Sequence, residues 1–145
     1  ITLQDTEPLP DKVMLSDFAG TVTADMMLTK AQCGEFMLAL LGHVRSAKVQ
    51  RTLDGFEREV NGDEAKYRQK LAFLLVDDIY PEISAHFGLP RSFQCTKALK
   101  QAIEIHMQGD VEMYTYSVEL ETTLRNWPAA EGNKAVLRQL LALQQ

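Results

Sequence analysis

The chain has 145 residues, of which 46% are hydrophobic and 24% are charged. This length and composition predict one folded globular domain, and they exclude an intrinsically disordered chain or a collagen-like fibre. The net charge of −5 argues against a general nucleic-acid-binding protein, because such proteins carry a surplus of basic residues that contact phosphates.

The first residues lack the periodic pattern of a helix or strand. Residues 1–10 contain Pro8 and Pro10, so we expect an extended leader there and a single helical domain over residues 11–145. The apolar residues that follow the leader form either a short strand or one helical turn, which Gly20 interrupts.

A capping box predicts the first clear helix. Thr29 is placed as an N-cap and Gln32 follows three residues later. Apolar residues then recur at helical spacing: Cys33, Phe36, Met37, Leu40, Leu41, Val44, Val49, Leu53, Phe56 and Val60. The phase of this pattern shifts near Arg45 and Ser46, which indicates either one kinked helix or two helices. Asn61 and Gly62 supply the left-handed conformation that ends a helix.

Two further helices are predicted in the middle of the chain. Asp63 caps the first, and Pro81 kinks or restarts it because proline has no N–H for the helical hydrogen bond. Ser92 caps the second, which ends at Gly109.

The segment over residues 111–125 has two interpretations. Its spacing fits a helix, but its alternation and its Tyr, Val and Thr content also fit a strand that would pair with residues 12–23 in a hairpin. We favour the helix. Pro128 and a turn at residues 131–133 are then expected to separate a last helix, Lys134–Leu143.

The predicted fold is therefore all-α: a single-domain irregular or orthogonal bundle of about five to seven helices, each burying one apolar stripe on its neighbours. The alternative is an α+β fold that contains the hairpin. Cys33 and Cys95 belong to no CxxC pair, and we expect two buried free thiols.

One short motif suggests phosphate chemistry. Residues 13–21 deliver Asp17 after an apolar run and place Thr21 in a Gly-Thr turn. The motif resembles the nucleophile motif of haloacid-dehalogenase-type phosphatases, and Ala19 resembles the phosphonoacetaldehyde-hydrolase branch. The resemblance implies a divergent or truncated Mg²⁺-dependent phosphate-ester hydrolase, with Asp17 as the nucleophile. The alternative is an ordinary aspartate beside a glycine turn.

A second acidic segment suggests a metal site. Asp77 and Asp78 follow an apolar helical run, and the segment resembles the aspartate-rich motif of terpene synthases, in which carboxylates hold Mg²⁺. Glu82 and His86 lie one helical turn apart and add two possible ligands. The alternative is a solvated acidic turn at a helix N-terminus.

Two groups of residues are candidates for partner binding. Arg45, Lys48 and Arg51 form a basic patch that suits a phosphate or an acidic partner. The other candidates are large apolar residues outside the clean stripes: Phe73, Tyr114 and Trp127. The alternatives are a solvated helix face and an ordinary core.

No catalytic set is complete, so the function we predict is a non-catalytic, soluble, acidic module for protein–protein interaction, or an accessory subunit, with no cofactor. It would bind a protein partner or a second copy, without nucleic acid and without membrane insertion. Mg²⁺ enters only with the alternative phosphate-ester hydrolase, and a carrier of small apolar ligands is a third hypothesis. The cytoplasm is the favoured compartment, or an organelle matrix if a targeting peptide has been removed.

Overall fold

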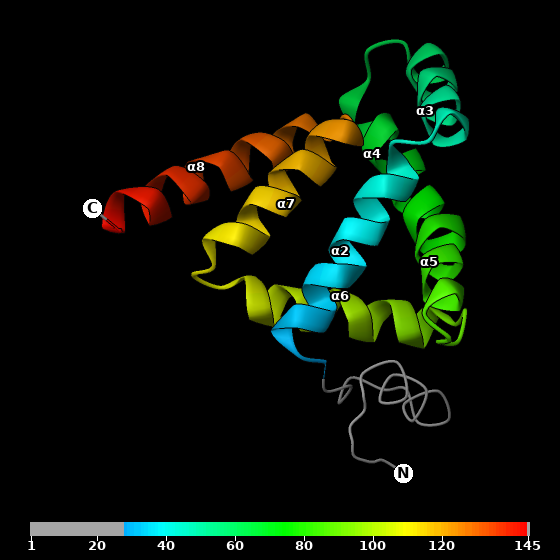
Figure 1. Ribbon diagram of the computed structural model, residues 1–145. Helices are drawn as coiled ribbons and strands as arrows, with labels where there is room; N and C mark the ends of the chain where they lie inside the picture. The colour runs from blue at the N-terminus through cyan, green and yellow to red at the C-terminus, as the bar shows by residue number, and fades with distance from the viewer. Residues whose placement is uncertain (1–27, 145) are drawn as a thin grey trace.

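The computed structural model describes residues 28–144, and all regular secondary structure in that range is helical, which confirms the all-α prediction. Figure 1 shows the arrangement. The elements in chain order are α2 (Lys30–Val44), α3 (Ala47–Val60), α4 (Glu64–Leu74), a π-helical turn η1 (Leu75–Ile79), α5 (Tyr80–His86), α6 (Phe93–Met107), α7 (Val111–Thr123) and α8 (Trp127–Leu143). The segment with two interpretations is thus helix α7, and the α+β alternative is wrong for it. The predicted leader and residues 12–23 lie outside the described residues.

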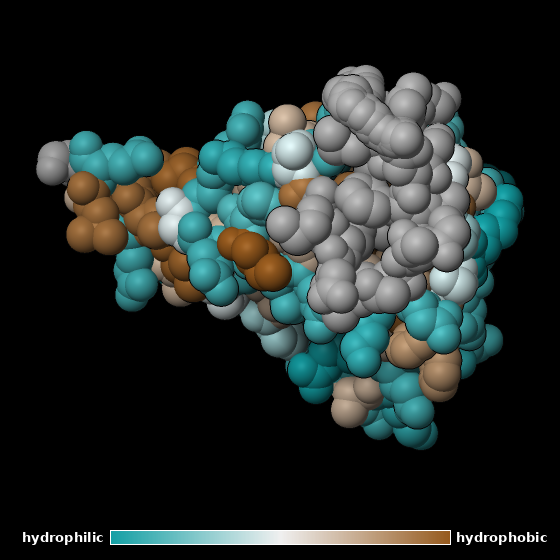
Figure 2. Space-filling model, turned by 90° about the horizontal axis from the view of Figure 1, so that it is seen from below, coloured by the Kyte–Doolittle hydropathy of each residue, from teal (hydrophilic) through white to brown (hydrophobic). Residues whose placement is uncertain are grey.

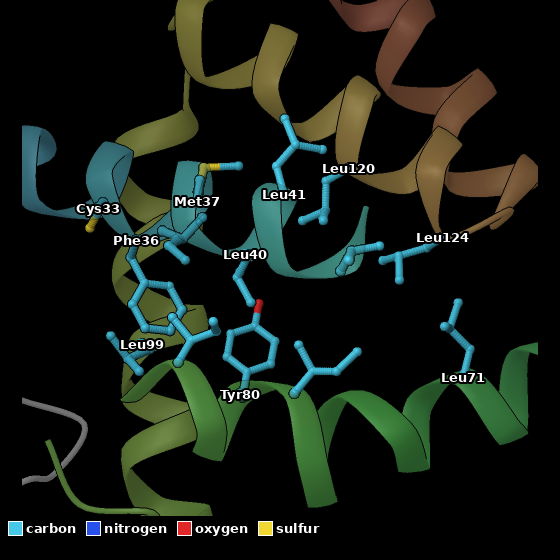
Figure 3. Packing of buried hydrophobic residues seen from close by; sticks show 14 of the residues in the cluster. Cys33, Phe36, Met37, Leu40, Leu41, Leu71, Tyr80, Leu99, Leu120 and Leu124 are labelled. Carbon is cyan, nitrogen blue, oxygen red and sulfur yellow. The ribbon is translucent and has the colours of Figure 1, made fainter. Parts of the chain in front are cut away.

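Helix α2 lies at the centre of the bundle. It packs against α7 on one side and against α5 and α6 on the other, and α3 follows it at a corner. Figure 3 shows its side chains between α5 and α7, with Phe36 and Leu40 facing Tyr80. The ring centroids of Phe36 and Tyr80 are 5.7 Å apart. Both predicted thiols, Cys33 and Cys95, are free and fully buried, as expected.

Local capping divides the chain as the sequence predicted. The backbone N–H of Gln32 donates to Thr29 Oγ1 at 3.1 Å, and the Thr29 N–H donates back to Gln32 Oε1 at 2.8 Å. Ser46 caps α3 by accepting from the Val49 N–H at 3.3 Å, so the phase shift marks two helices rather than one kinked helix. Asn61 ends α3 in the left-handed conformation, with φ of 48°.

The helical path continues through Pro81 by means of the π-helical turn η1. A proline inside a regular α-helix removes one hydrogen bond, and its ring clashes with the carbonyl four residues earlier. Here the N–H of Tyr80 donates to the carbonyl of Leu75, five residues earlier. The wider turn places Pro81 in the first turn of α5, where a missing N–H is tolerated.

The prediction that the last helix begins at Lys134 is wrong, because α8 already begins at Trp127. Pro128 lies in its first turn, where the fixed φ of proline suits a helix. Gly132 and Asn133 continue the helix instead of forming a turn. A glycine inside a helix costs only about 1 kcal/mol, and packing on α7 offsets this cost, with Asn133 Nδ2 donating to Ser117 Oγ at 2.8 Å.

Two side chains fix the α7–α8 turn to the neighbouring helices. The buried Tyr67 hydroxyl on α4 donates to the carbonyl of Leu124 at 2.7 Å. Arg125 has a left-handed φ of 62°. Its guanidinium donates to Asp54 Oδ1 at 2.8 Å and to Glu57 Oε1 at 2.7 Å, both on α3. The turn is therefore positioned by residues that lie 57 to 71 positions earlier in the chain.

We expect Asp110 to contribute acid-sensitive stability. It caps α7 by accepting from the Met113 N–H at 2.9 Å, and it forms an ion pair with Lys30. The hydrogen bond from Lys30 lowers the pKa of Asp110 below its ordinary value. Because the folded-state pKa is depressed, this stabilisation is present above the unfolded pKa of about 3.9 and is lost as the pH falls through the folded value.

The variant Asp110→Asn tests this expectation, since asparagine keeps a capping oxygen and removes the charge. Denaturant unfolding at neutral pH and at about pH 3 gives the loss of stability on acidification. The wild type should lose more stability than the variant over this interval. An equal loss in the two proteins would contradict the assignment.

Candidate functional site

The residues of the predicted phosphatase motif, Asp17 and Thr21, lie outside the described residues. Residues 28–144 contain no strand. The hydrolase hypothesis therefore stays a prediction from residues 13–21.

The structure places the predicted metal ligands in solvent. Asp77 and Asp78 are exposed on η1, and Glu82 and His86 are exposed on α5. Glu82 Oε1 lies 4.0 Å from Arg91 Nη1, as part of a surface ion pair. In the part of the chain that the structure describes, no three side chains of histidine, cysteine, aspartate or glutamate lie close enough to hold a metal ion.

The predicted basic patch lies at the corner between α2 and α3. Arg45, Lys48 and Arg51 are all exposed. Arg45 Nη2 lies 3.6 Å from Glu119 Oε1 on α7. The exposure of these three side chains is consistent with both interpretations of the patch, a solvated helix face and a binding surface for an acidic partner.

The three predicted apolar contact residues are not brought together. Phe73 is 60% exposed on α4, Trp127 is 47% exposed at the start of α8, and Tyr114 is half-buried on α7. Each lines a different depression of the surface. They do not form one binding surface.

The sequence did not predict the exposure of an apolar face on α8. This face consists of the residues that we call the α8 apolar strip: Val136, Leu137, Leu140, Leu141 and Leu143. All of these side chains except Leu143 were expected to be buried on neighbouring helices, but none of the five is buried. Leu141 is 44% exposed, Leu143 is 81% exposed, and the others are half-buried. The periodicity of the sequence indicated an apolar face on this helix. It could not indicate that no second helix of the described chain would cover that face.

The position of α8 explains this exposure. It packs mainly on α7 and projects beyond it, so that its C-terminal turns lie away from the remaining described helices. Figure 2 shows hydrophobic surface along this projecting arm. Apolar surface that is gathered on one projecting element is typical of an interaction site, whereas single exposed apolar residues are not.

The charges of the two outer helices are of opposite sign. Helix α7 carries Glu112, Glu119 and Glu121 with no lysine or arginine, whereas α8 carries Lys134 and Arg138 with one glutamate. Lys134 is paired with that glutamate, Glu131, at 3.2 Å. Arg138 has no ion pair among the described residues. The α8 apolar strip is thus flanked by basic charge and lies beside an acidic helix.

No protein-family model, curated protein or solved structure matches the chain. In residues 28–144 no helix combines the length and the apolar character that crossing a membrane requires.

Proposed function

We propose that the chain is a helical protein–protein interaction module that self-associates through the α8 apolar strip. The observation that supports this proposal is the incomplete burial of a 17-residue helix that packs mainly on one neighbour. A long amphipathic helix gains most of its stability from packing of its apolar face. A second copy of the chain would supply the packing that α8 lacks.

The pattern of the strip suits an antiparallel pairing of two α8 helices. Leu137 and Leu141 are one turn apart, as are Val136 and Leu140, which gives a continuous seam along the helix. A two-fold contact places the same surface on both copies. The two α7–α8 hairpins would then form a four-helix bundle, a common architecture for such seams.

Charge complementarity also supports a second copy as the partner. Each copy carries the acidic α7, with Glu112 and Glu119, beside α8, which carries Lys134 and Arg138. When two such hairpins pair, basic residues of one copy would lie near the acidic helix of the other copy. Opposite charges steer association and fix the register.

The energetic gain is concentrated in the most exposed leucines. Full burial of a leucine side chain contributes roughly 1.5–3 kcal/mol. Leu141 and Leu143 are only partly exposed in the single chain, so each contributes part of this free energy when it is buried. A two-fold contact contains both residues from each copy, so each contribution counts twice.

Sedimentation equilibrium of wild type and Leu141→Glu tests the proposal. The wild-type mass should rise with concentration from 16.3 kDa toward twice that value. The variant places a charge in the seam and should raise the dissociation constant about tenfold or more, because burying an unpaired charge is costly.

The matched control is Phe93→Glu. Phe93 is 62% exposed at the start of α6, away from α8, and its replacement should leave association unchanged. A wild-type mass of 16.3 kDa at every concentration would overturn the proposal, and so would equal weakening by the two variants.

A further inference from the structure

A cleft opens on the surface of the bundle, between α2, α5, α6, α7 and α8. Its volume is about 530 Å³, which falls within the roughly 300–1,000 Å³ range of small-molecule sites. Leu40, Ile103 and Leu120 line it and are buried, whereas Lys100 and Glu104 line it and are exposed. The cleft therefore has an apolar floor and a charged rim.

The hydroxyl of a buried side chain borders this cleft and has no partner among the described residues. Tyr80 is only 8% exposed, and its hydroxyl forms no hydrogen bond among the described residues. Figure 3 shows the hydroxyl directed away from α5 toward Leu40, which lines the same cleft. Burial raises the pKa of Tyr80, and Glu121 and Glu104 raise it further. Tyrosine hydroxyls ordinarily have a hydrogen-bond partner, and this one is free to bond water or a ligand in the cleft.

A half-buried carboxylate faces the same space. Glu121 lines the cleft from α7, and one of its oxygens accepts from Asn126 Nδ2 at 3.1 Å. No lysine or arginine of the described chain lies within 4.0 Å of it, so it has no ion pair there. Burial raises the pKa of Glu121 above its ordinary value, although the hydrogen bond from Asn126 and the charge of Lys100 oppose the shift. A cation in the cleft would stabilise the charged form of this side chain.

The aromatic ring at the site also accepts a cation. Lys100 Nζ lies 6.0 Å from the centroid of the Tyr80 ring, a distance at which ammonium groups are attracted to aromatic faces. Lys100 is exposed, so its side chain can turn into solvent when the ammonium group of a ligand enters the cleft. With Glu104 and Glu121 against Lys100, the charged lining is net negative.

We propose that the cleft binds a small primary amine with an apolar body. The ammonium group lies between the Glu121 carboxylate and the Tyr80 hydroxyl oxygen, both of which accept its hydrogen bonds. The apolar body lies against Met37, Leu40 and Ile103. This binding is non-covalent, and it does not depend on self-association through α8.

Calorimetric titration of the wild-type chain with three ligands of equal length tests the proposal. The ligands are n-hexylammonium, 1-hexanol and hexanoate at neutral pH. Hexylammonium should bind about tenfold more tightly than hexanol or better, because a hydrogen bond to a charged group contributes more than a neutral one. Hexanoate should bind most weakly. This comparison uses the unmodified chain, so it does not depend on how any variant folds.

A pair of variants identifies the carboxylate. Glu121→Gln should weaken hexylammonium binding about tenfold and leave hexanol binding unchanged. Glu119→Gln, on the same helix but exposed, should change neither. Equal affinity for the amine and the alcohol, preference for hexanoate, failure of all three ligands to bind, or an unchanged Glu121→Gln variant would each overturn the proposal.

Discussion

Replacing Leu40 by alanine is expected to lower the free energy of unfolding by about 2–5 kcal/mol. Leu40 is 1% exposed and lies on the central helix α2, where it faces Tyr80 on α5. The truncation removes buried apolar surface and leaves a cavity that the surrounding helices fill only in part. Urea unfolding followed by circular dichroism measures the loss.

The matched control is Leu38→Ala. Leu38 lies two residues earlier on the same helix and is 48% exposed, so its truncation should change stability by no more than about 0.5 kcal/mol. Similar losses at the two positions would show that α2 is not the centre of the core.

Replacing Tyr67 by phenylalanine is expected to cost about 1–3 kcal/mol, because it leaves a buried carbonyl without its donor. The Tyr67 hydroxyl donates to the Leu124 carbonyl at 2.7 Å and connects α4 to the end of α7. Burial raises the pKa of Tyr67 to about 12, so the hydroxyl keeps its proton at neutral pH. Thermal and denaturant unfolding measure the change.

Tyr116→Phe is the control for this prediction. The Tyr116 hydroxyl donates to Glu112 Oε2 at 3.0 Å on the surface of α7, where water replaces the lost partner. The expected change is within about 0.5 kcal/mol. A loss as large as that of Tyr67→Phe would contradict the account of the buried hydrogen bond.

Helix boundaries that depend on local chemistry were predictable from the sequence. Thr29, Ser92 and Asp63 each accept a hydrogen bond from the backbone N–H three residues later. This contact involves only neighbours in the chain, so the residue type at the cap carries the signal. Asn61 ended α3 for the same kind of local reason.

The start of α8 was not predictable in this way. Pro128 and Gly132 are compatible with a loop and also with a helix. Packing on α7 selects the helix: the side chain of Asn133 donates a hydrogen bond to the hydroxyl of Ser117. A pattern of neighbouring residues in the sequence does not contain that contact. The same reason explains why Val111–Thr123 had two interpretations until its neighbours were known.

The candidate sites depend still more on distant contacts. Tyr80 and Glu121 lie far apart in the chain and meet at one cleft. Of the predicted contact residues, Tyr114 lines this cleft, whereas Phe73 and Trp127 line other depressions. Periodicity identifies an apolar face, but only the fold determines whether another helix covers it.

Amide hydrogen exchange at several protein concentrations tests the central claim most directly, because it locates any surface that a second copy covers. Self-association through α8 predicts that residues 137–143 become more protected as the concentration rises, while α6 stays unchanged. Protection of α8 that is independent of concentration, or a rise confined to another surface such as the one around Phe73, would contradict the claim.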